Sequence, residues 1–470
     1  MTPFFDPVSY WWARFLFLRG LAFTYLLAFI CVKRQYIPLL GENGITPFTE
    51  FTDRVDFWES PSLFFFLDSD RFIEIGAWLG ILLSTVALLG LPQQLGTGIT
   101  AAVFLMLWTL YLSYVNVGRI FYGFGWESML TEAGFLAVFL GASGTATPDL
   151  VIWLIRWMLF RVMFGAGLIK LRGDDTWNNL TALNYHYETQ PMPNPLSHFL
   201  HNMPEKWHKF ETAATHFIQL VVPLFFFAPQ PFAAIAGLLT IGFHLVLMIG
   251  GNYSWLNSLS IVLCFSLFSD SMMQQFLSLT APAVTPVHPV HQVALLGYTA
   301  LVVGLSYYSV RNMASENQRM NSSFEPLKLV NTYGAFGSVT RKRYEVVVEG
   351  KDPDTGEWKE YGFYGKPTDT EERPPQVAPY HLRLDWQMWF AAMSPRPRRR
   401  WFRRFMHKLA ENDRETLKLL EDNPLPENGP EKVRAKRYVY RFTDLDTWRE
   451  TGEYWEREEV KKFFPSISGD

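Results

Sequence analysis

The first two thirds of the chain is poor in charge. Charged residues make up 19% of the sequence, against about a quarter in an average soluble domain. The runs 75–118, 212–269 and 271–310 contain no Asp, Glu, Lys or Arg. Each run is at least twice the roughly 20 residues that one membrane span needs. A large soluble helical core would need charged outer faces, which these runs lack. They therefore predict several membrane-spanning helices and exclude a single soluble globule.

Cysteine is almost absent as well, with only Cys31 and Cys264, both in apolar segments. Two such residues cannot build a disulfide framework or a zinc site. The net charge of −3 gives no basis for a nucleic-acid partner. There is no G-x-S-x-G elbow, phosphate-binding loop, H-E-x-x-H or dinucleotide fingerprint. We therefore expect no metal, cofactor or nucleic acid.

The apolar segments predict a polytopic α-helical membrane domain over residues 1–311. Short turns between most of them favour an antiparallel bundle. A long polar loop, residues 172–211, interrupts the series, and a loop of this length is more often functional than idle. We expect about nine spans, near residues 15–32, 75–91, 99–115, 124–141, 150–171, 212–228, 232–250, 254–268 and 290–310.

Residues 312–470 carry more than half of the charged residues and predict a soluble α+β C-terminal domain. Residues 344–349 and 358–364 alternate with period two around the turn sequence 352–356, which predicts a hairpin. Residues 438–442 predict another strand, paired with the segment around 454–457. Residues 385–393 and 400–421 are expected to be helical.

Ionisable residues inside the fourth and fifth apolar segments predict an intramembrane polar network. Charges in a bilayer are costly, so they face the bundle interior and pair. We expect the pairs Glu132–Arg161 or Glu127–Lys170. One hypothesis is a polar site for an ion, quinone or lipid headgroup; the other, which we favour, is a set of ion pairs that fixes helix register. The network comprises Glu127, Glu132, Arg156, Arg161 and Lys170.

The polar loop contains several histidines. His186 and Glu188 could form an acid–base couple, and His198, His201 and His208 could bind a metal. Neither spacing matches a zinc site well, because no carboxylate or cysteine stands at a suitable offset. We favour an aromatic, hydrogen-bonded cap on the mouth of the bundle or on a partner.

Two stretches of the C-terminal domain are candidates for binding. Arg383, Asp385, Trp386 and Trp389 belong to a segment of the residue types that dominate interface hot spots, although an ordinary core helix would use its aromatics in the same way. The arginine-rich run 396–404 suits phosphate headgroups, while a solvated face is the commoner explanation.

These segments together resemble the lipase maturation factor family. The carrying stretches are FGWESMLTEAGF (124–135), residues 159–170, LTALNYHYETQP (180–191), VNTYGAFGS (330–338) and PYHLRLDWQMWFA (379–391). The resemblance implies a multi-span protein whose C-terminal domain is lumenal or extracytoplasmic. The chain looks like a bacterial member, which would lie in the cytoplasmic membrane; animal members lie in the endoplasmic reticulum membrane.

The resemblance also implies a function: assisting secreted lipases to reach their active fold, with the polar loop and C-terminal domain meeting the client. The partners would be a secreted lipase-like protein and the lipid bilayer. We expect client contact, or shaping of the contact surface, at Tyr185, His186, Tyr187, Glu188, Arg383, Asp385, Trp386 and Trp389. The membrane part is more distantly similar to vitamin K-dependent carboxylases, so the alternative is an intramembrane enzyme with a lipid-soluble cofactor.

Overall fold

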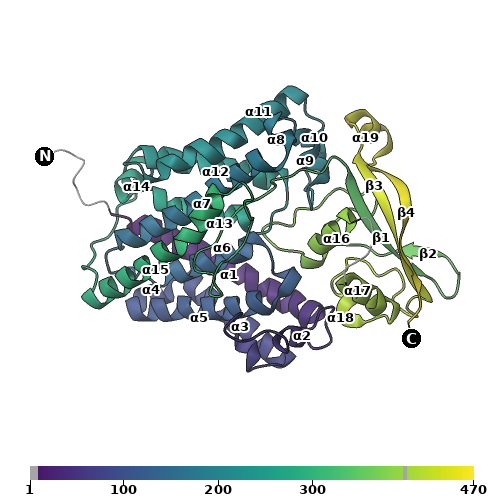
Figure 1. Ribbon diagram of the computed structural model, residues 1–470, viewed down its shortest axis with the longest axis horizontal. Coiled ribbons are helices and arrows are strands. Elements are labelled where there is room, and N and C mark those ends of the chain that lie inside the picture. Colours follow the sequence, from purple (N-terminus) through teal and green to yellow (C-terminus); the bar gives the residue numbers. More distant parts are fainter. Residues whose placement is uncertain (1–8, 395–399, 470) are drawn as a thin grey trace.

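The computed structural model describes residues 9–394 and 400–469 (Figure 1). A bundle of helices runs from the start of the described chain to Ala314. Figure 1 shows a four-stranded sheet with four further helices gathered at one end of this bundle. The fold class that the sequence predicts, a polytopic helical region followed by an α+β region, is confirmed.

The bundle is built from long apolar helices connected by short turns. Its main helices are α1 (Trp11–Leu40), α3 (Asp70–Leu89), α4 (Leu91–Leu95), α5 (Thr97–Val117), α6 (Gly125–Ala137), α7 (Asp149–Gly173), α11 (Glu205–His216), α12 (Phe232–Gly250), α13 (Leu256–Cys264), α14 (Asp270–Leu277) and α15 (Pro289–Ala314). Single turns are α2 (Thr49–Thr52), η1 (Leu63–Phe65), η2 (Arg119–Phe121) and η5 (Phe265–Leu267).

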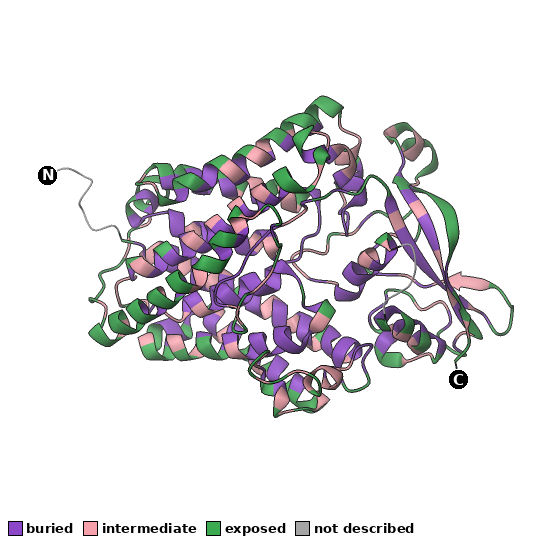
Figure 2. Ribbon diagram, viewed as in Figure 1, coloured by how far each residue is buried: buried purple, intermediate pink, exposed green. Residues whose placement is uncertain are grey.

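The outer faces of these helices are apolar and exposed, as a lipid-facing surface requires. Leu82, Leu238 and Val303 are 59%, 60% and 67% exposed. Figure 2 shows exposed residues along the outside of the bundle and buried ones inside it. A water-soluble helix would place polar residues on such a face. The bundle is therefore an integral membrane domain.

Among the described residues, seven helices are long and apolar enough to cross a membrane, or eight if one bent pair counts as a span. This is fewer than the nine expected, and the difference lies at two segments. The expected span 124–141 is the 13-residue helix α6, which at 1.5 Å per residue covers about 20 Å of the roughly 30 Å needed. The expected span 254–268 is the first arm of a pair bent by 101°.

The expected polar loop is largely helical and forms a layer between the bundle and the sheet. It holds the short helices α8 (Asp175–Asn178), α9 (Leu183–Thr189) and α10 (Ser197–His201). Its last residues already belong to α11, which continues through a π turn, η3 (Phe217–Val221), and a 3-10 segment, η4 (Val222–Phe227).

The C-terminal sheet is antiparallel with the strand order β2-β1-β3-β4. The expected hairpin is formed by β1 and β2, with Lys351 opposite Trp358. The expected pairing of residue 442 with the 454–457 segment is also present, since Phe442 lies opposite Trp455. The strands are β1 (Arg343–Lys351), β2 (Trp358–Glu360), β3 (Lys432–Phe442) and β4 (Trp455–Ile467).

Helices α16 (Arg383–Met393) and α17 (Arg400–Ala410) cover one face of this sheet. The region also contains α18 (Arg414–Leu417) and α19 (Leu445–Thr451). Helix α17 packs Phe402 against Phe463 and Phe464 of β4, while its Trp401 contacts Phe121 of the bundle. The expected helix 400–421 is divided into α17 and α18, because Asn412 between them adopts a left-handed backbone conformation with a φ of 53°.

Candidate functional site

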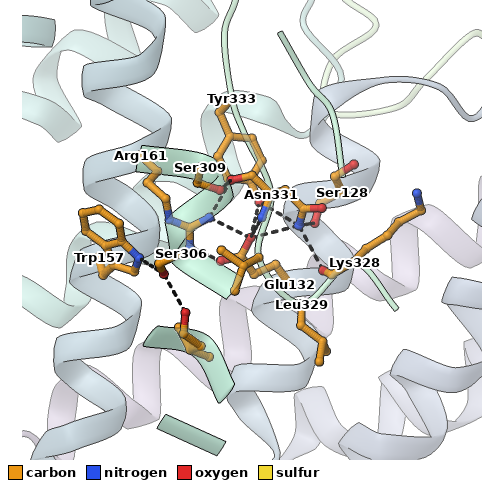
Figure 3. A network of polar contacts seen from close by, with 12 residues as sticks. Ser128, Glu132, Trp157, Arg161, Ser306, Ser309, Lys328, Leu329, Asn331 and Tyr333 are labelled. Atoms are coloured by element: carbon orange, nitrogen blue, oxygen red, sulfur yellow. Dashed lines mark hydrogen bonds and ion pairs between the residues drawn. The ribbon is translucent and has the colours of Figure 1, made fainter. Parts of the chain in front are cut away.

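Glu132 and Arg161 form the ion pair that the sequence predicts, between α6 and α7. Both side chains are 2% exposed. The second carboxylate oxygen of Glu132 accepts hydrogen bonds from the backbone N–H of Asn331 at 3.0 Å, from Asn331 Nδ2 at 2.9 Å and from the Tyr333 hydroxyl at 2.8 Å (Figure 3). Arg161 donates in return to the Asn331 carbonyl at 2.7 Å. A pair with this many partners is stabilised against its desolvation cost.

The pair therefore holds a third segment, residues 330–338, against the bundle. This segment passes so close to α7 that a Cβ at Gly165 would lie 2.5 Å from the Tyr333 carbonyl oxygen. A Cβ at Gly173 would lie 2.2 Å from the carbonyl oxygen of Gly337. Glycine at these two positions permits the approach of backbone to backbone.

Glu127 pairs with Arg383 of α16, so the expected pair with Lys170 does not form. Arg383 donates to Glu127 Oε1 at 2.7 Å and to the Phe121 carbonyl at 2.6 Å. Both charged side chains are fully buried. The Tyr111 hydroxyl donates to the other oxygen of Glu127. This ion pair links the C-terminal domain to the interior of the bundle.

The neighbours of Arg383 strengthen that link. The Arg383 backbone N–H donates to Gln35 Oε1 at 2.9 Å, and Gln35 Nε2 donates to the His381 carbonyl at 2.7 Å. Burial alone lowers the pKa of Arg383, but Glu127 more than offsets this and raises it above its usual value. Burial and the Arg383 charge lower the pKa of His381 to about 4. His381 is therefore neutral at pH 7.

The other two expected members of the polar network lie apart from both pairs. Lys170 donates to the Ala335 carbonyl at 2.8 Å and lies 5.1 Å from the centre of the Trp177 ring. Arg156 donates to the Ser266 carbonyl and to the Tyr10 hydroxyl, each at 3.0 Å. The five residues of the expected polar network thus lie in separate contacts and do not form a single polar site.

His186 does not form a couple with Glu188. Its Nε2 lies 2.8 Å from the Tyr253 hydroxyl, which donates to Gln190 Oε1 at 2.5 Å. Burial and the charge of Lys170 lower the pKa of His186 to about 4. It is a neutral, buried hydrogen-bonding residue.

Glu188 instead joins the polar loop to the end of β3. Its Oε2 accepts a hydrogen bond from the Phe442 N–H at 2.9 Å and lies 3.7 Å from His201 Nε2. His198 Nε2 lies 2.8 Å from the Thr443 carbonyl. Of the histidines considered as metal ligands, His198 and His201 lie in this junction, while His208 Nε2 lies 3.3 Å from the His201 carbonyl. Within residues 9–394 and 400–469, no group of three or more His, Cys, Asp or Glu could hold a metal ion.

Arg343, which the sequence analysis did not single out, forms the third buried junction. It donates to the carbonyls of Glu188, Gln190 and Pro191 at 2.9, 2.5 and 3.1 Å. It also pairs with Glu345 at 2.6 Å. Residues 343 and 345 are two positions apart on a strand, so both side chains lie on one face of the sheet, and this spacing could have predicted the pair. The polar loop is thereby fixed to β1.

The residues expected to contact the client, or to shape the contact surface, differ in exposure. Arg383, Asp385 and Trp386 are 0%, 1% and 3% exposed, which is compatible with shaping the surface from beneath. Asp385 accepts hydrogen bonds from the N–H groups of Gly365 and Lys366 at 2.8 and 3.2 Å, and burial raises its pKa to about 6.

The remaining expected contacts divide by exposure. His186, Tyr187 and Glu188 are buried at 7%, 6% and 9%, while Tyr185 and Trp389 are half-buried. Trp389 Nε1 donates to the Thr189 carbonyl at 3.0 Å, so α16 touches the end of α9 here. The arrangement as a whole fixes the C-terminal domain and the polar loop rigidly to one end of the membrane bundle.

Comparison with known proteins gives consistent results over nearly the whole chain. The family model "Lipase maturation factor transmembrane domain" matches residues 12–275, and "Lipase maturation factor C-terminal domain" matches residues 329–465. Lipase maturation factor 1 of Mus musculus is 38% identical, over 98% of this chain and 88% of the mouse protein. The human protein of that name is 37% identical, over 98% and 88%. Lipase maturation factor 2 of Xenopus laevis is 31% identical, over 97% and 82%. No solved structure matches the chain.

Proposed function

Because the chain belongs to the lipase maturation factor family, we propose that it is a membrane-embedded maturation factor for secreted lipases. One observation carries the proposal. The similarity to proteins named for this role extends through both the bundle and the C-terminal domain, at 38% identity over 98% of the chain. The comparisons give no support to the alternative of an intramembrane carboxylase-type enzyme.

The proposed mechanism is binding without covalent change. A factor that binds a near-native client more tightly than the unfolded one raises the yield of the folded form by mass action. Cys31 and Cys264 are both free and fully buried, so neither can exchange disulfides with a client. The rigid attachment through Glu127, Arg383 and Arg343 would keep the client-binding surface in a fixed position beside the membrane.

We place the C-terminal domain on the lumenal or extracytoplasmic side, where secreted clients fold. The membrane would be the endoplasmic reticulum in a eukaryotic host and the cytoplasmic membrane in a bacterial one. Protease added to sealed vesicles of known orientation tests this side. In vesicles whose cytoplasmic face is outside, protection of the C-terminal domain until detergent permeabilises the membrane supports this side. Cleavage of the domain in intact vesicles of that orientation contradicts it.

Client contact is proposed at the seam between α9 and α16, where Trp389 is half-buried, and at half-buried Tyr185, on the part of α9 that packs against Trp177. The buried members of the earlier set, His186, Tyr187 and Glu188, would shape this seam from beneath. Half-exposed aromatic residues beside a fully packed layer are typical of interface hot spots.

Co-expression of this chain with a secreted homodimeric lipase, in cells that lack a maturation factor, tests the function. We expect more lipase activity per secreted lipase molecule than with an empty vector. The variant Trp389→Ala should reduce that gain. Trp448→Ala serves as the matched control, because Trp448 of α19 is also a half-buried tryptophan but packs against Tyr454 and His198. Equal lipase activity with and without the chain would contradict the proposed function; an unchanged gain with Trp389→Ala would contradict only the seam.

A further inference from the structure

A small pocket opens at the end of α5, beside η2 and the start of α6. The segment 321–328, which returns from α15 along the bundle, closes its other side. The pocket has a volume of about 170 Å³. Its lining residues are Val115, Asn116, Arg119, Tyr122, Gly123, Ser128, Asn321, Ser323 and Lys328.

The lining of this pocket carries two cations and no carboxylate. In the described part of the chain, Lys328 Nζ has neither a hydrogen-bond nor an ion-pair partner, and burial lowers its pKa although Glu325 opposes this. The guanidinium of Arg119 has only Glu50, at 3.9 Å. A partly desolvated cation whose neighbouring carboxylate is distant or shared is costly, and an anion in the pocket would offset that cost.

The carboxylate beside Arg119 is already shared. Glu50 also binds Arg404, and it lies 3.5 Å from Arg400. With Arg403, these are the described arginines of the arginine-rich run, of which residues 396–399 lie outside the described residues. Three guanidinium groups on one carboxylate leave a surplus of positive charge next to the pocket.

Neutral donors complete the pocket. Neither Ser128 Oγ nor Asn321 Nδ2 has a hydrogen-bond partner in the described ranges, so both are available to a ligand. In Figure 3 the amine of Lys328 points away from the Glu132–Arg161 pair, on the side of α6 where Ser128 lies. Hydroxyl, amide and cationic donors together are the set that binds phosphate oxygens.

The backbone of the pocket is held in an unusual conformation. Arg119, Asn321 and Lys328 have φ of 50, 52 and 55, in the left-handed region that non-glycine residues rarely adopt. Such a conformation persists only where its surroundings impose it. Three of these residues line one cavity, so the fold determines where their side chains start.

The pocket lies at the end of a candidate membrane span. Helix α5 ends at Val117, two residues before Arg119. Asn116 Nδ2 donates to the Pro61 carbonyl at 2.9 Å, which ties the pocket to the segment 57–66. That segment exposes Trp58 and Phe66, at 82% and 72%, and exposed aromatic residues mark the membrane–water interface.

We propose that this pocket binds the phosphate group of a phospholipid headgroup, in the leaflet on the side of the C-terminal domain. Arg119 and Lys328 supply the charge, and Ser128 and Asn321 supply further hydrogen bonds. A free phosphate offers the same chemistry, and the experiment separates the two sources.

The test uses the full chain in neutral maltoside micelles, with thermal unfolding followed by tryptophan fluorescence. Three probes are added separately: dioleoylphosphatidylglycerol, dioleoylglycerol, which has the same acyl chains without phosphate, and sodium phosphate. We expect phosphatidylglycerol to raise the unfolding temperature more than dioleoylglycerol does. In Arg119→Gln/Lys328→Gln that difference should disappear, with apparent lipid affinity at least about tenfold weaker.

The difference between the two lipids is taken within each protein, so a change in basal stability cancels. Lys418→Gln, at an exposed position directly after α18, is the matched control and should keep the wild-type difference, as should Lys328→Arg. Should the double variant not fold, Lys328→Gln replaces it, because Nζ makes no contact that the fold uses. An equal shift with sodium phosphate, also lost in the variant, assigns the site to free phosphate. No phosphate-dependent shift in the wild type, or a shift that the variants retain, overturns the proposal.

Discussion

Removing the guanidinium of Arg383 should loosen the C-terminal domain from the bundle. In Arg383→Met the methionine fills much of the same volume, but Glu127 loses its only strong counter-ion while remaining fully buried. The hydroxyl of Tyr111 and the ring of His381, whose Nδ1 lies 3.5 Å from Glu127 Oε1, still face the carboxylate. They cannot supply a full positive charge at pH 7, because the pKa of His381 is about 4.

The cost of breaking one side of a buried ion pair is about 3–5 kcal/mol. Because Tyr111 and His381 remain, we expect the lower part of this range for Arg383→Met, and about 3 kcal/mol is roughly a hundredfold in the unfolding equilibrium. The double variant Glu127→Gln/Arg383→Met removes both charges and should recover most of the loss, since a neutral replacement of a buried pair is often tolerated. Without the Arg383 charge, His381 should also take up a proton more readily, so the loss should shrink below pH 6.

Denaturant unfolding of the purified protein in micelles measures these differences, and limited proteolysis of the C-terminal domain reports its release. Arg449→Met is the matched control, because its partner Asp446 is on the exposed surface. We expect no measurable change for it. If Arg383→Met were as stable as the control, or if the double variant were as unstable as Arg383→Met alone, the buried pair would not be what attaches the domain.

Three further changes test other contacts, each by the same denaturant assay. Burial raises the pKa of Asp385 to about 6. Between about pH 4 and 6 the folded state therefore holds a proton that the unfolded state has lost, and at pH 7 the ionised carboxyl destabilises the fold. Relative to wild type, Asp385→Asn should be more stable at pH 7 than at pH 4, by about 2–3 kcal/mol. A pH-independent difference would contradict this. Glu132→Gln leaves the Arg161 charge uncompensated and should cost about 3–5 kcal/mol, and a loss below about 1 kcal/mol would show that the pair is dispensable. Asn252 accepts from the N–H groups of residues 377 and 378, both at 2.8 Å, so Asn252→Ala should cost about 2–4 kcal/mol; faster proteolysis within 373–380 should accompany it, and unchanged cleavage there would count against this role.

The parts of the fold that depend on local pattern could be predicted from the sequence. The charge-free runs identified the membrane domain, and period-two alternation around residues 352–356 identified the β1–β2 hairpin. The Glu132–Arg161 pair was one of two alternatives expected from opposite charges on successive antiparallel helices, and it forms, whereas Glu127–Lys170 does not. In each case the contacting residues are near in sequence, or the hydrophobic periodicity of the segment indicates which of its faces is buried.

The partner of Glu127 could not be predicted in this way. Arg383 is 256 positions away, and no periodicity connects a membrane helix with a helix of another domain. The aromatic and arginine content around residue 383 is equally typical of an exposed binding surface and of a buried junction. Helix α6 was taken for a span because apolarity alone does not distinguish a lipid-facing helix from one enclosed by other helices.

The central claim is that the docked C-terminal domain is what allows this chain to mature lipases. The most direct test is the activity per secreted lipase molecule in cells that express wild type, Arg383→Met, or Glu127→Gln/Arg383→Met at equal abundance in the membrane. Our account predicts that Arg383→Met loses most of the gain over the empty vector and that the double variant restores it. Full activity with Arg383→Met, under conditions where proteolysis shows its C-terminal domain released, would contradict the claim.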